Sequence, residues 1–119
     1  MQDFKKLLVW QKSIQLVINT YKATSTFPSE ERFGLTNQIR RAVISISNNI
    51  AEGCGRFSQK DLVHFLQVSL GSTNEIENCL IISQALDFMA EEVFNNLNSQ
   101  NTEVRKMLIS LIEKIRKEK

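Results

Sequence analysis

The sequence predicts an all-α fold, an up-down-up-down antiparallel four-helix bundle. Apolar residues recur at spacings of three and four in four long segments, which is the periodicity of helices with one buried face. Only one Pro and four Gly interrupt the 119 residues, and this length fits a single domain whose helices are joined by short loops. We expect the helices at about residues 7–23, 29–53, 59–86 and 90–117.

The first two predicted helices each carry an apolar stripe. In residues 7–23 the stripe steps by four, three and four residues, and we expect Trp10 to be a core anchor. Pro28 suits the first position of a helix, so the second helix is expected to restart at Pro28 or Ser29, with a kink at Gly34. The stripes consist of Trp10, Ile14, Val17 and Tyr21 in the first helix and of Ile39, Val43, Ile46 and Ile50 in the second.

The third and fourth predicted helices have clear start and register signals. Two glycines within residues 53–58 end the second helix, and Ser58 is a natural N-cap for the third, with Asp61 three residues on. Residues 90–117 contain a heptad pattern in which Asn101 is the one polar position, and we interpret Asn101 as a register-setting residue. The heptad positions are Phe94, Leu97, Asn101, Val104, Leu108, Leu111 and Ile115.

A polar stripe runs along the second predicted helix beside the apolar one. Ser and Asn are poor helix formers because their side chains compete for backbone hydrogen bonds, so another reason must account for them. We interpret the stripe as a buried hydrogen-bonded network that fixes helix register; a contact across a subunit boundary and a substrate site are the alternatives. The network is expected to contain Arg41, Ser45, Asn48, Asn49 and Glu52, together with Ser72 and Glu75 of the third helix.

Four strings occur in order along the chain: VWQK at 9–12, FPSEE at 27–31, QIRRAVISISNNIAEG at 38–53 and LGSTNEIE at 70–77. Through them the chain resembles the 23S rRNA intervening-sequence protein family of bacterial four-helix-bundle proteins, whose relatives include the accessory variability proteins of diversity-generating retroelements. Ser47, where many members have Pro, and Cys54, where a bulkier residue is usual, depart from the pattern. The resemblance implies a ring-shaped homo-oligomer, most often a homopentamer, and a role with rRNA fragments or a reverse transcriptase.

Charge is distributed unevenly along the sequence. Residues 1–60 carry nine Lys or Arg against four acids, whereas residues 61–119 carry six against nine. We interpret the basic residues of the first half as candidate RNA contacts at one end or in the bore of a ring; a solvated charged surface is the alternative. Phe57 beside Arg56 could stack on a base, and Phe33 is a weaker candidate. The candidate contacts are Lys5, Lys6, Lys12, Arg40, Arg56 and Lys60.

The sequence lacks the motifs of the common enzyme and metal-site classes. A two-metal bundle site requires two Glu-x-x-His motifs, but the chain has one histidine, His64. P-loop, GxSxG and dinucleotide fingerprints are also missing. At helical spacing from His64 only Lys60 and Asp61 could act with it, so we interpret His64 as a surface or interface histidine rather than a general base. We therefore expect no catalytic, metal-binding or cofactor-binding residues and no enzyme activity.

The two cysteines and the hydropathy pattern indicate a reduced, cytoplasmic protein. Cys54 and Cys79 have no metal-site or redox-motif spacing. We expect Cys79, among Leu and Ile residues, to be packed and inert, and Cys54 to be more exposed in a loop. No leader pattern opens the sequence, and no apolar run approaches the ~20 residues needed to span a bilayer, so a membrane partner is not expected.

Additional apolar positions predict that the bundle associates with copies of itself. These positions are Leu16, Ile44, Ile81, Ile82 and Ile112. The leading hypothesis is a non-enzymatic, homo-oligomeric scaffold or adaptor that contacts RNA or a nucleic-acid-processing partner through a basic surface. The alternative is a protein–protein interaction module without nucleic-acid binding, and salt-dependent RNA binding would distinguish the two.

Overall fold

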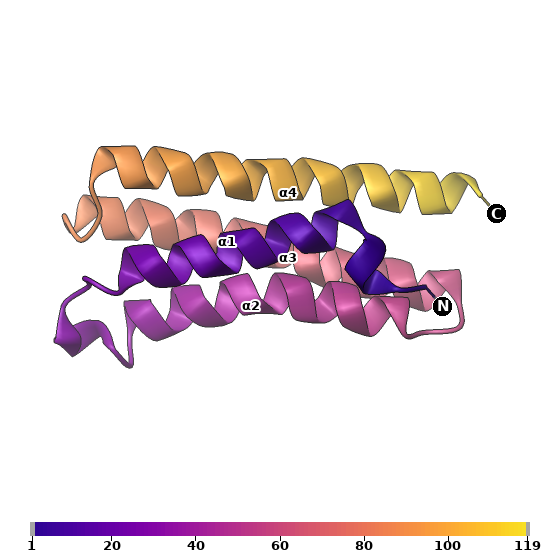
Figure 1. Cartoon of the computed structure of the whole chain (residues 1–119), viewed down its shortest axis with the longest axis horizontal. Helices are drawn as coiled ribbons and strands as arrows, with labels where there is room; N and C mark the ends of the chain where they lie inside the picture. The colour runs from indigo at the N-terminus through magenta and orange to yellow at the C-terminus, as the bar shows by residue number, and fades with distance from the viewer. Residues whose placement is uncertain (1, 119) are drawn as a thin grey trace.

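The computed structural model describes residues 2–118, which form four long helices and two short 3-10 helices (Figure 1). The long helices are α1 (Leu8–Thr24), α2 (Leu35–Cys54), α3 (Gln59–Ala85) and α4 (Glu91–Lys117). The short helices are η1 (Phe4–Lys6) and η2 (Ser29–Glu31). These residues contain no strand, so the predicted all-α four-helix bundle is confirmed.

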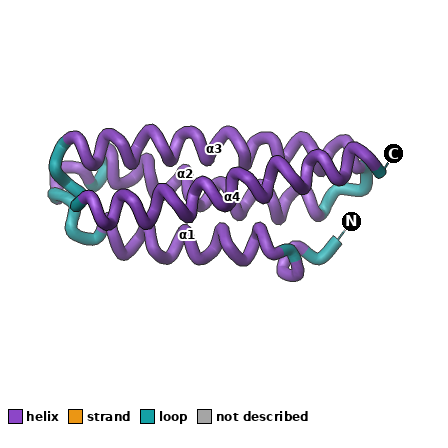
Figure 2. The backbone as a smooth tube through the Cα atoms, turned by 90° about the horizontal axis from the view of Figure 1, so that it is seen from above, coloured by secondary structure: helices purple, strands orange, loops and turns teal. Residues whose placement is uncertain are grey.

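Consecutive helices run antiparallel along the long axis of a body of 47 × 23 × 20 Å (Figures 1 and 2). α1 packs against α2 and α4, and α3 packs against the same two helices, so the four surround one core. Up-down-up-down order brings the start of α1, the α2–α3 loop and the end of α4 to one end of the bundle. The α1–α2 and α3–α4 loops lie at the other end.

α2 begins later than the sequence predicts. The expected helix start at Pro28 or Ser29 is wrong, because only the short η2 forms there and α2 starts at Leu35. Gly34 leaves helical backbone angles (φ −110°, ψ −115°), which separates the two helices. The carboxylate of Glu31 then caps α2, since its Oε1 accepts the Leu35 N–H at 3.1 Å.

The connection between α2 and α3 is short, and its capping follows the prediction. Ser58 Oγ accepts the backbone N–H of Asp61 at 3.1 Å and so caps α3. α2 continues one residue beyond Gly53, and this places Cys54 in the last helical turn with 1% of its surface exposed. The expectation that Cys54 is exposed in a loop is therefore wrong.

The core takes side chains from all four helices, and in α2 and α4 the buried residues include the stripes that apolar periodicity predicts. Burying a Val, Leu or Ile side chain stabilises the fold by about 1.5–3 kcal/mol each. Of the α4 heptad, Phe94 and Leu111 are partly buried and the other positions are buried. The fully buried residues of these two stripes include Ile39, Val43, Ile46, Ile50, Leu97, Val104 and Leu108.

α1 buries a face that is rotated from the predicted one. Trp10 is only half-buried, at the edge of the core, where its ring packs edge-on against Phe4 at 5.2 Å between centroids. Ser13 Oγ donates to the Trp10 carbonyl at 2.7 Å, and Thr24 Oγ1 donates to the Thr20 carbonyl at 2.8 Å. Because these small hydroxyl groups bond to their own helix, they can be buried at low cost. The buried face is Val9, Ser13, Leu16, Thr20 and Thr24.

Candidate functional site at the basic end of the bundle

The predicted polar stripe of α2 meets α3 only at its centre. Ser72 Oγ lies 3.0 Å from Ser45 Oγ, and the two hydroxyls form a hydrogen bond between the helices. Asn49 Nδ2 donates to the Ser45 carbonyl at 2.8 Å and lies 3.1 Å from Ser45 Oγ. These three residues therefore form a small, partly buried polar contact between α2 and α3.

The other four residues of the predicted network lie on the surface. Arg41, Asn48, Glu52 and Glu75 are exposed, and Glu52 pairs with Arg56 on its own side of the bundle at 2.8 Å. A buried network of all seven residues within one chain is thus wrong. The stripe follows the outer edge of the α2–α3 contact, where long charged side chains extend into water. The subunit-boundary alternative stays a prediction.

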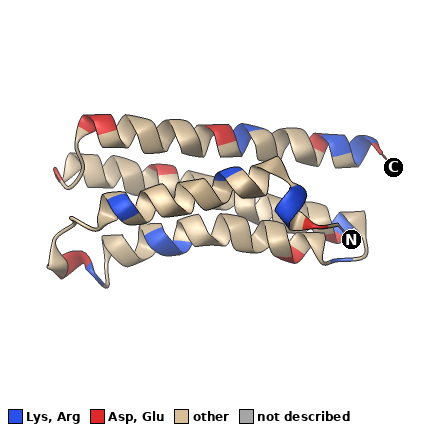
Figure 3. Cartoon of the chain, in the orientation of Figure 1, with Lys and Arg blue, Asp and Glu red and all other residues tan. Residues whose placement is uncertain are grey.

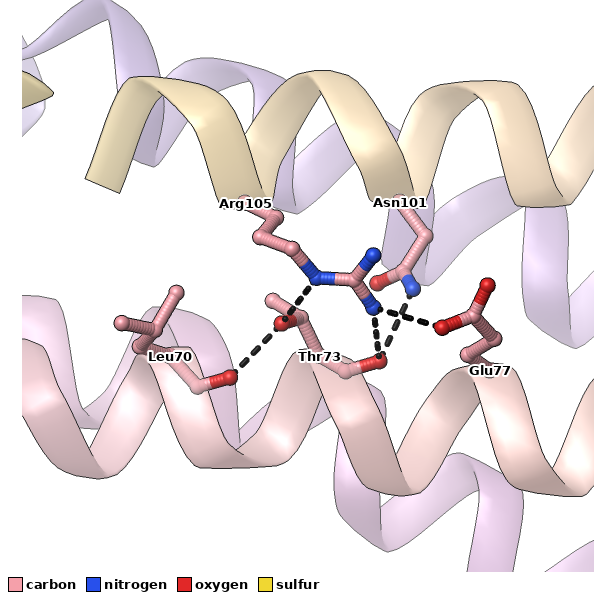
Figure 4. Close-up of polar contacts among 5 residues, drawn as sticks. All are labelled: Leu70, Thr73, Glu77, Asn101 and Arg105. Carbon is pink, nitrogen blue, oxygen red and sulfur yellow. Dashed lines mark hydrogen bonds and ion pairs between the residues drawn. The ribbon is translucent and has the colours of Figure 1, made fainter. Parts of the chain in front are cut away.

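A more extensive polar network joins α3 and α4 (Figure 4). Asn101, fully buried, donates from Nδ2 to the Thr73 carbonyl at 2.9 Å. Arg105 donates to Thr73 Oγ1 at 3.2 Å, to the Thr73 carbonyl at 3.3 Å and to Glu77 Oε1 at 3.1 Å. Thr73 Oγ1 in turn donates to the Leu70 carbonyl at 2.6 Å. The heptad pattern indicated Asn101, whereas Arg105 and Glu77 gave no sequence signal beyond their charges.

The six predicted basic residues do not gather at one place. Four of them lie at the end of the bundle that holds the start of α1 and the α2–α3 loop (Figure 3), namely Lys5, Lys6, Arg56 and Lys60. Arg40 lies near the opposite end, where its guanidinium covers the Tyr21 ring at 4.4 Å and its Nε donates to Thr24 Oγ1 at 2.9 Å. Lys12 pairs with Glu103 at 3.5 Å. Arg40 and Lys12 are thus engaged within the chain.

Three further cations join this end from the last turn of α4, and the sequence reasoning missed them. They are Lys114, Arg116 and Lys117. These three residues belong to the half of the sequence that is acidic as a whole, so its net charge gave no signal for them. The topology does give one, because in an up-down-up-down bundle the fourth helix ends at the same end of the bundle where the first helix begins.

We define the basic end as residues 2–7, 52–61 and 113–118. It carries seven Lys or Arg against five acids, a net charge of +2. The opposite end, residues 22–41 and 84–95, carries four against five, a net charge of −1. The difference between the two ends is therefore real but modest for one chain.

Two hollows at the basic end are lined by cations. One has a volume of about 300 Å³ and lies between the start of α3 and the end of α4; we call it the α3–α4 groove. Its lining residues are Lys60, Val63, His64, Gln67 and Arg116. The other, of about 170 Å³, lies beside the α2–α3 loop and is lined in part by Arg56 and Phe57. Phe57 is 89% exposed, so its ring is free to stack on a flat ligand.

Both thiols of the chain are buried, and its single histidine is exposed. Burial raises the pKa of both the Cys54 and the Cys79 thiol, which keeps them in the unreactive protonated form. In the described part of the chain, no three His, Cys, Asp or Glu side chains come together in a way that could hold a metal ion. His64 is exposed, and its ring packs edge-on against Phe65 at 5.5 Å between centroids. Across residues 2–118, none of the helices combines the length and apolarity that crossing a bilayer requires.

Comparison with known proteins identifies the family. A crystal structure of a protein of unknown function from the S23 ribosomal protein family of Bacteroides thetaiotaomicron matches with a TM-score of 0.82 and 27% sequence identity, over 89% of this chain and 96% of that chain. No curated protein matches the sequence. The pattern that defines the 23S rRNA-intervening sequence proteins matches residues 5–110, which include α1, α2, α3 and most of α4. The chain therefore belongs to the 23S rRNA-intervening sequence protein family.

Proposed function

We propose that this protein is a non-enzymatic, self-associating helical scaffold of the cytoplasm that contacts RNA through its basic end. The observation that carries the proposal is the convergence of seven cations from three separate stretches of chain on one end of the bundle. Phosphate groups are the usual partners of such surfaces, because neutralising them releases counterions and gives salt-dependent affinity. A nucleic-acid-processing enzyme, such as a reverse transcriptase, would reach the same surface through the RNA it carries.

Self-association would increase the effect of a modest charge. A net charge of +2 at one end is small for a single chain, but repetition in a ring of five copies would present it five times to one RNA. Of the apolar positions from which the sequence predicts self-association, Leu16 and Ile112 are buried in the core of the single chain, so they do not support it. Exposed apolar side chains do support such an assembly, since copies of the chain could cover them. On α3, Ile81 is 53% exposed, Val68 and Ile82 are also exposed, and Leu86 directly after the helix is 52% exposed. Light scattering of the native protein tests the copy number.

The RNA proposal is tested by measuring the affinity for a short single-stranded RNA across salt concentrations. Each lost phosphate contact should lower the slope of log affinity against log salt by about 0.7. A triple variant of the basic end should therefore flatten the slope by about 2, whereas a control that removes the same charge elsewhere should leave the slope nearly unchanged. The test variant is Lys5→Ala, Lys6→Ala and Lys117→Ala, and the control is Lys22→Ala, Arg32→Ala and Lys106→Ala.

The second candidate function is a protein–protein interaction module without nucleic-acid binding. The exposed apolar residues of α3 favour it, because they would suit an apolar protein partner as well as a second copy. RNA binding that is absent, or that is indifferent to salt and to the triple variant, would refute the RNA proposal and favour this candidate.

A further inference from the structure

The α3–α4 groove brings together cations that are distant in the sequence. Lys60 and His64 lie one turn apart near the start of α3, and Arg116 reaches the same hollow from the last turns of α4. Val63 and Gln67 complete the lining of this open hollow of about 300 Å³. The antiparallel packing of α3 and α4 is what creates this combination, because it sets the first turns of one helix beside the last turns of the other.

Among the described residues, the two basic side chains Lys60 and Arg116 have no ion-pair partner and form no side-chain hydrogen bond. By contrast, Arg56 pairs with Glu52 at 2.8 Å and Arg105 pairs with Glu77 at 3.1 Å. The nearest acids in the sequence, Asp61, Glu113 and Glu118, do not line the groove. Two unpaired cations that face one hollow repel each other, and an anion between them would relieve that repulsion.

The donor set fits an oxyanion and not a metal ion. A guanidinium offers paired donors to phosphate oxygens, an ammonium offers a compact charge, and the imidazole and the Gln67 amide each supply a further N–H. Carboxylate and thiolate groups, which divalent ions prefer, do not line the groove.

We propose that the α3–α4 groove is a phosphate-binding site, in which Lys60, His64 and Arg116 hold a phosphate group of single-stranded RNA. The choice of RNA as the source of that phosphate rests on the proposed function, whereas the site itself rests on the groove. Phe57 is exposed beside the other hollow at the same end of the bundle, where an unpaired base of the same RNA could stack on its ring.

The first experiment uses the single histidine of the chain as a probe. Because there is only one His, the imidazole signals in a proton NMR spectrum belong to His64 alone. Pyrophosphate, added at constant pH and ionic strength, should shift these signals saturably. The double variant Lys60→Ala and Arg116→Ala should weaken the affinity at least about tenfold, since both charge-assisted contacts are lost. The control, Arg32→Ala and Lys106→Ala, removes the same charge and should bind as the unmodified protein does.

The second experiment identifies the source of the phosphate. An RNA octamer is compared with and without a 5′-phosphate, using the same groove and control variants. If the 5′-phosphorylated octamer binds more tightly than the unphosphorylated one, and the groove variant abolishes this difference, the site holds a terminal phosphate. If the two octamers bind equally and the groove variant weakens the binding of both, the site holds an internal phosphodiester. Equal losses in the groove and control variants overturn the site.

Failure of the proposed function gives a different result. If no RNA binds while pyrophosphate still shifts the His64 signals, RNA is refuted as the source of the phosphate and the groove stands as a site for a smaller anion. If neither RNA nor pyrophosphate acts on His64, the phosphate site is refuted as well.

Discussion

Replacement of Asn101 by leucine should stabilise the protein, although it removes a buried hydrogen bond. Asn101 Nδ2 donates to the Thr73 carbonyl at 2.9 Å, and that carbonyl keeps a second donor, Arg105 Nη2 at 3.3 Å, after the change. Asn101 Oδ1 is buried without a hydrogen-bond partner in the described residues. Leucine has nearly the shape of asparagine, so Asn101→Leu leaves no cavity and removes the unsatisfied oxygen.

The magnitude follows from three terms of different sign. Loss of the Nδ2 bond costs about 0.5–1.5 kcal/mol, and removal of the unsatisfied buried acceptor gains about 1–3 kcal/mol. Burial of the leucine side chain adds about 1.5–3 kcal/mol before repacking costs, so a net gain of roughly 2 kcal/mol is expected. For a chain of this length each kcal/mol corresponds to about 4 °C in Tm, and a rise of about 8 °C follows.

Urea unfolding and thermal unfolding measure this change, with Asn95→Leu as the control. Asn95 is exposed on the same helix, so its replacement reports only the helix-propensity difference, about 0.5 kcal/mol. A loss of more than about 1 kcal/mol in Asn101→Leu would refute the reasoning, because it would mean that Oδ1 is satisfied. Amide NMR spectra of the same variant test the register interpretation: one set of signals would contradict it, and several sets would support it.

Three further predictions concern packing, thiol reactivity and the α3–α4 ion pair. Gly53→Ala should destabilise the protein by about 1–3 kcal/mol in urea unfolding, because the added Cβ would lie 3.0 Å from the nearest side-chain atom of α3. Gly71 has open space around it, so Gly71→Ala should stabilise the protein by about 0.5–1 kcal/mol. Cys54 and Cys79, whose pKa values are raised by burial, should resist alkylation at pH 8 until denaturant is added; rapid labelling of either native thiol would contradict the packing. Arg105→Ala should cost about 1–3 kcal/mol, since it removes charge-assisted bonds to α3, and a change below 0.5 kcal/mol would count against the network.

Apolar periodicity predicts the helices well where one face is uniformly apolar. In α2 the apolar stripe predicted from the sequence is the stripe that is buried, because no other face of this helix is uniformly apolar. It consists of Ile39, Val43, Ile46 and Ile50. In α1 the same argument selects the wrong face. There the buried positions include Ser13 and Thr20, and hydrophobicity alone cannot recognise a face that is lined by hydroxyl groups.

The candidate site is less accessible to sequence reasoning, because it depends on which helix ends meet. Arg40 and Lys60 have equal charge in the sequence, yet the Arg40 guanidinium stacks on a tyrosine ring whereas Lys60 lines a groove. Arg116 could have been placed at the basic end from topology alone, since the predicted strand-free, antiparallel order already fixes where α4 ends. The groove itself could not, because its depth depends on side-chain packing.

Both ends of the described chain lie at the end of the bundle that holds the α2–α3 loop, and Gln2 donates its N–H to the Cys54 carbonyl at 3.0 Å (Figure 1). An affinity tag attached at either terminus would therefore hang over the surface whose binding is to be measured, and a polyhistidine tag would add its own imidazoles to the NMR readout. A dye attached through the α3–α4 turn near Asp87, at the far end of the molecule, would report on binding without touching it. The antiparallel order of the helices thus determines where a tag or dye can be attached without disturbing the binding surface.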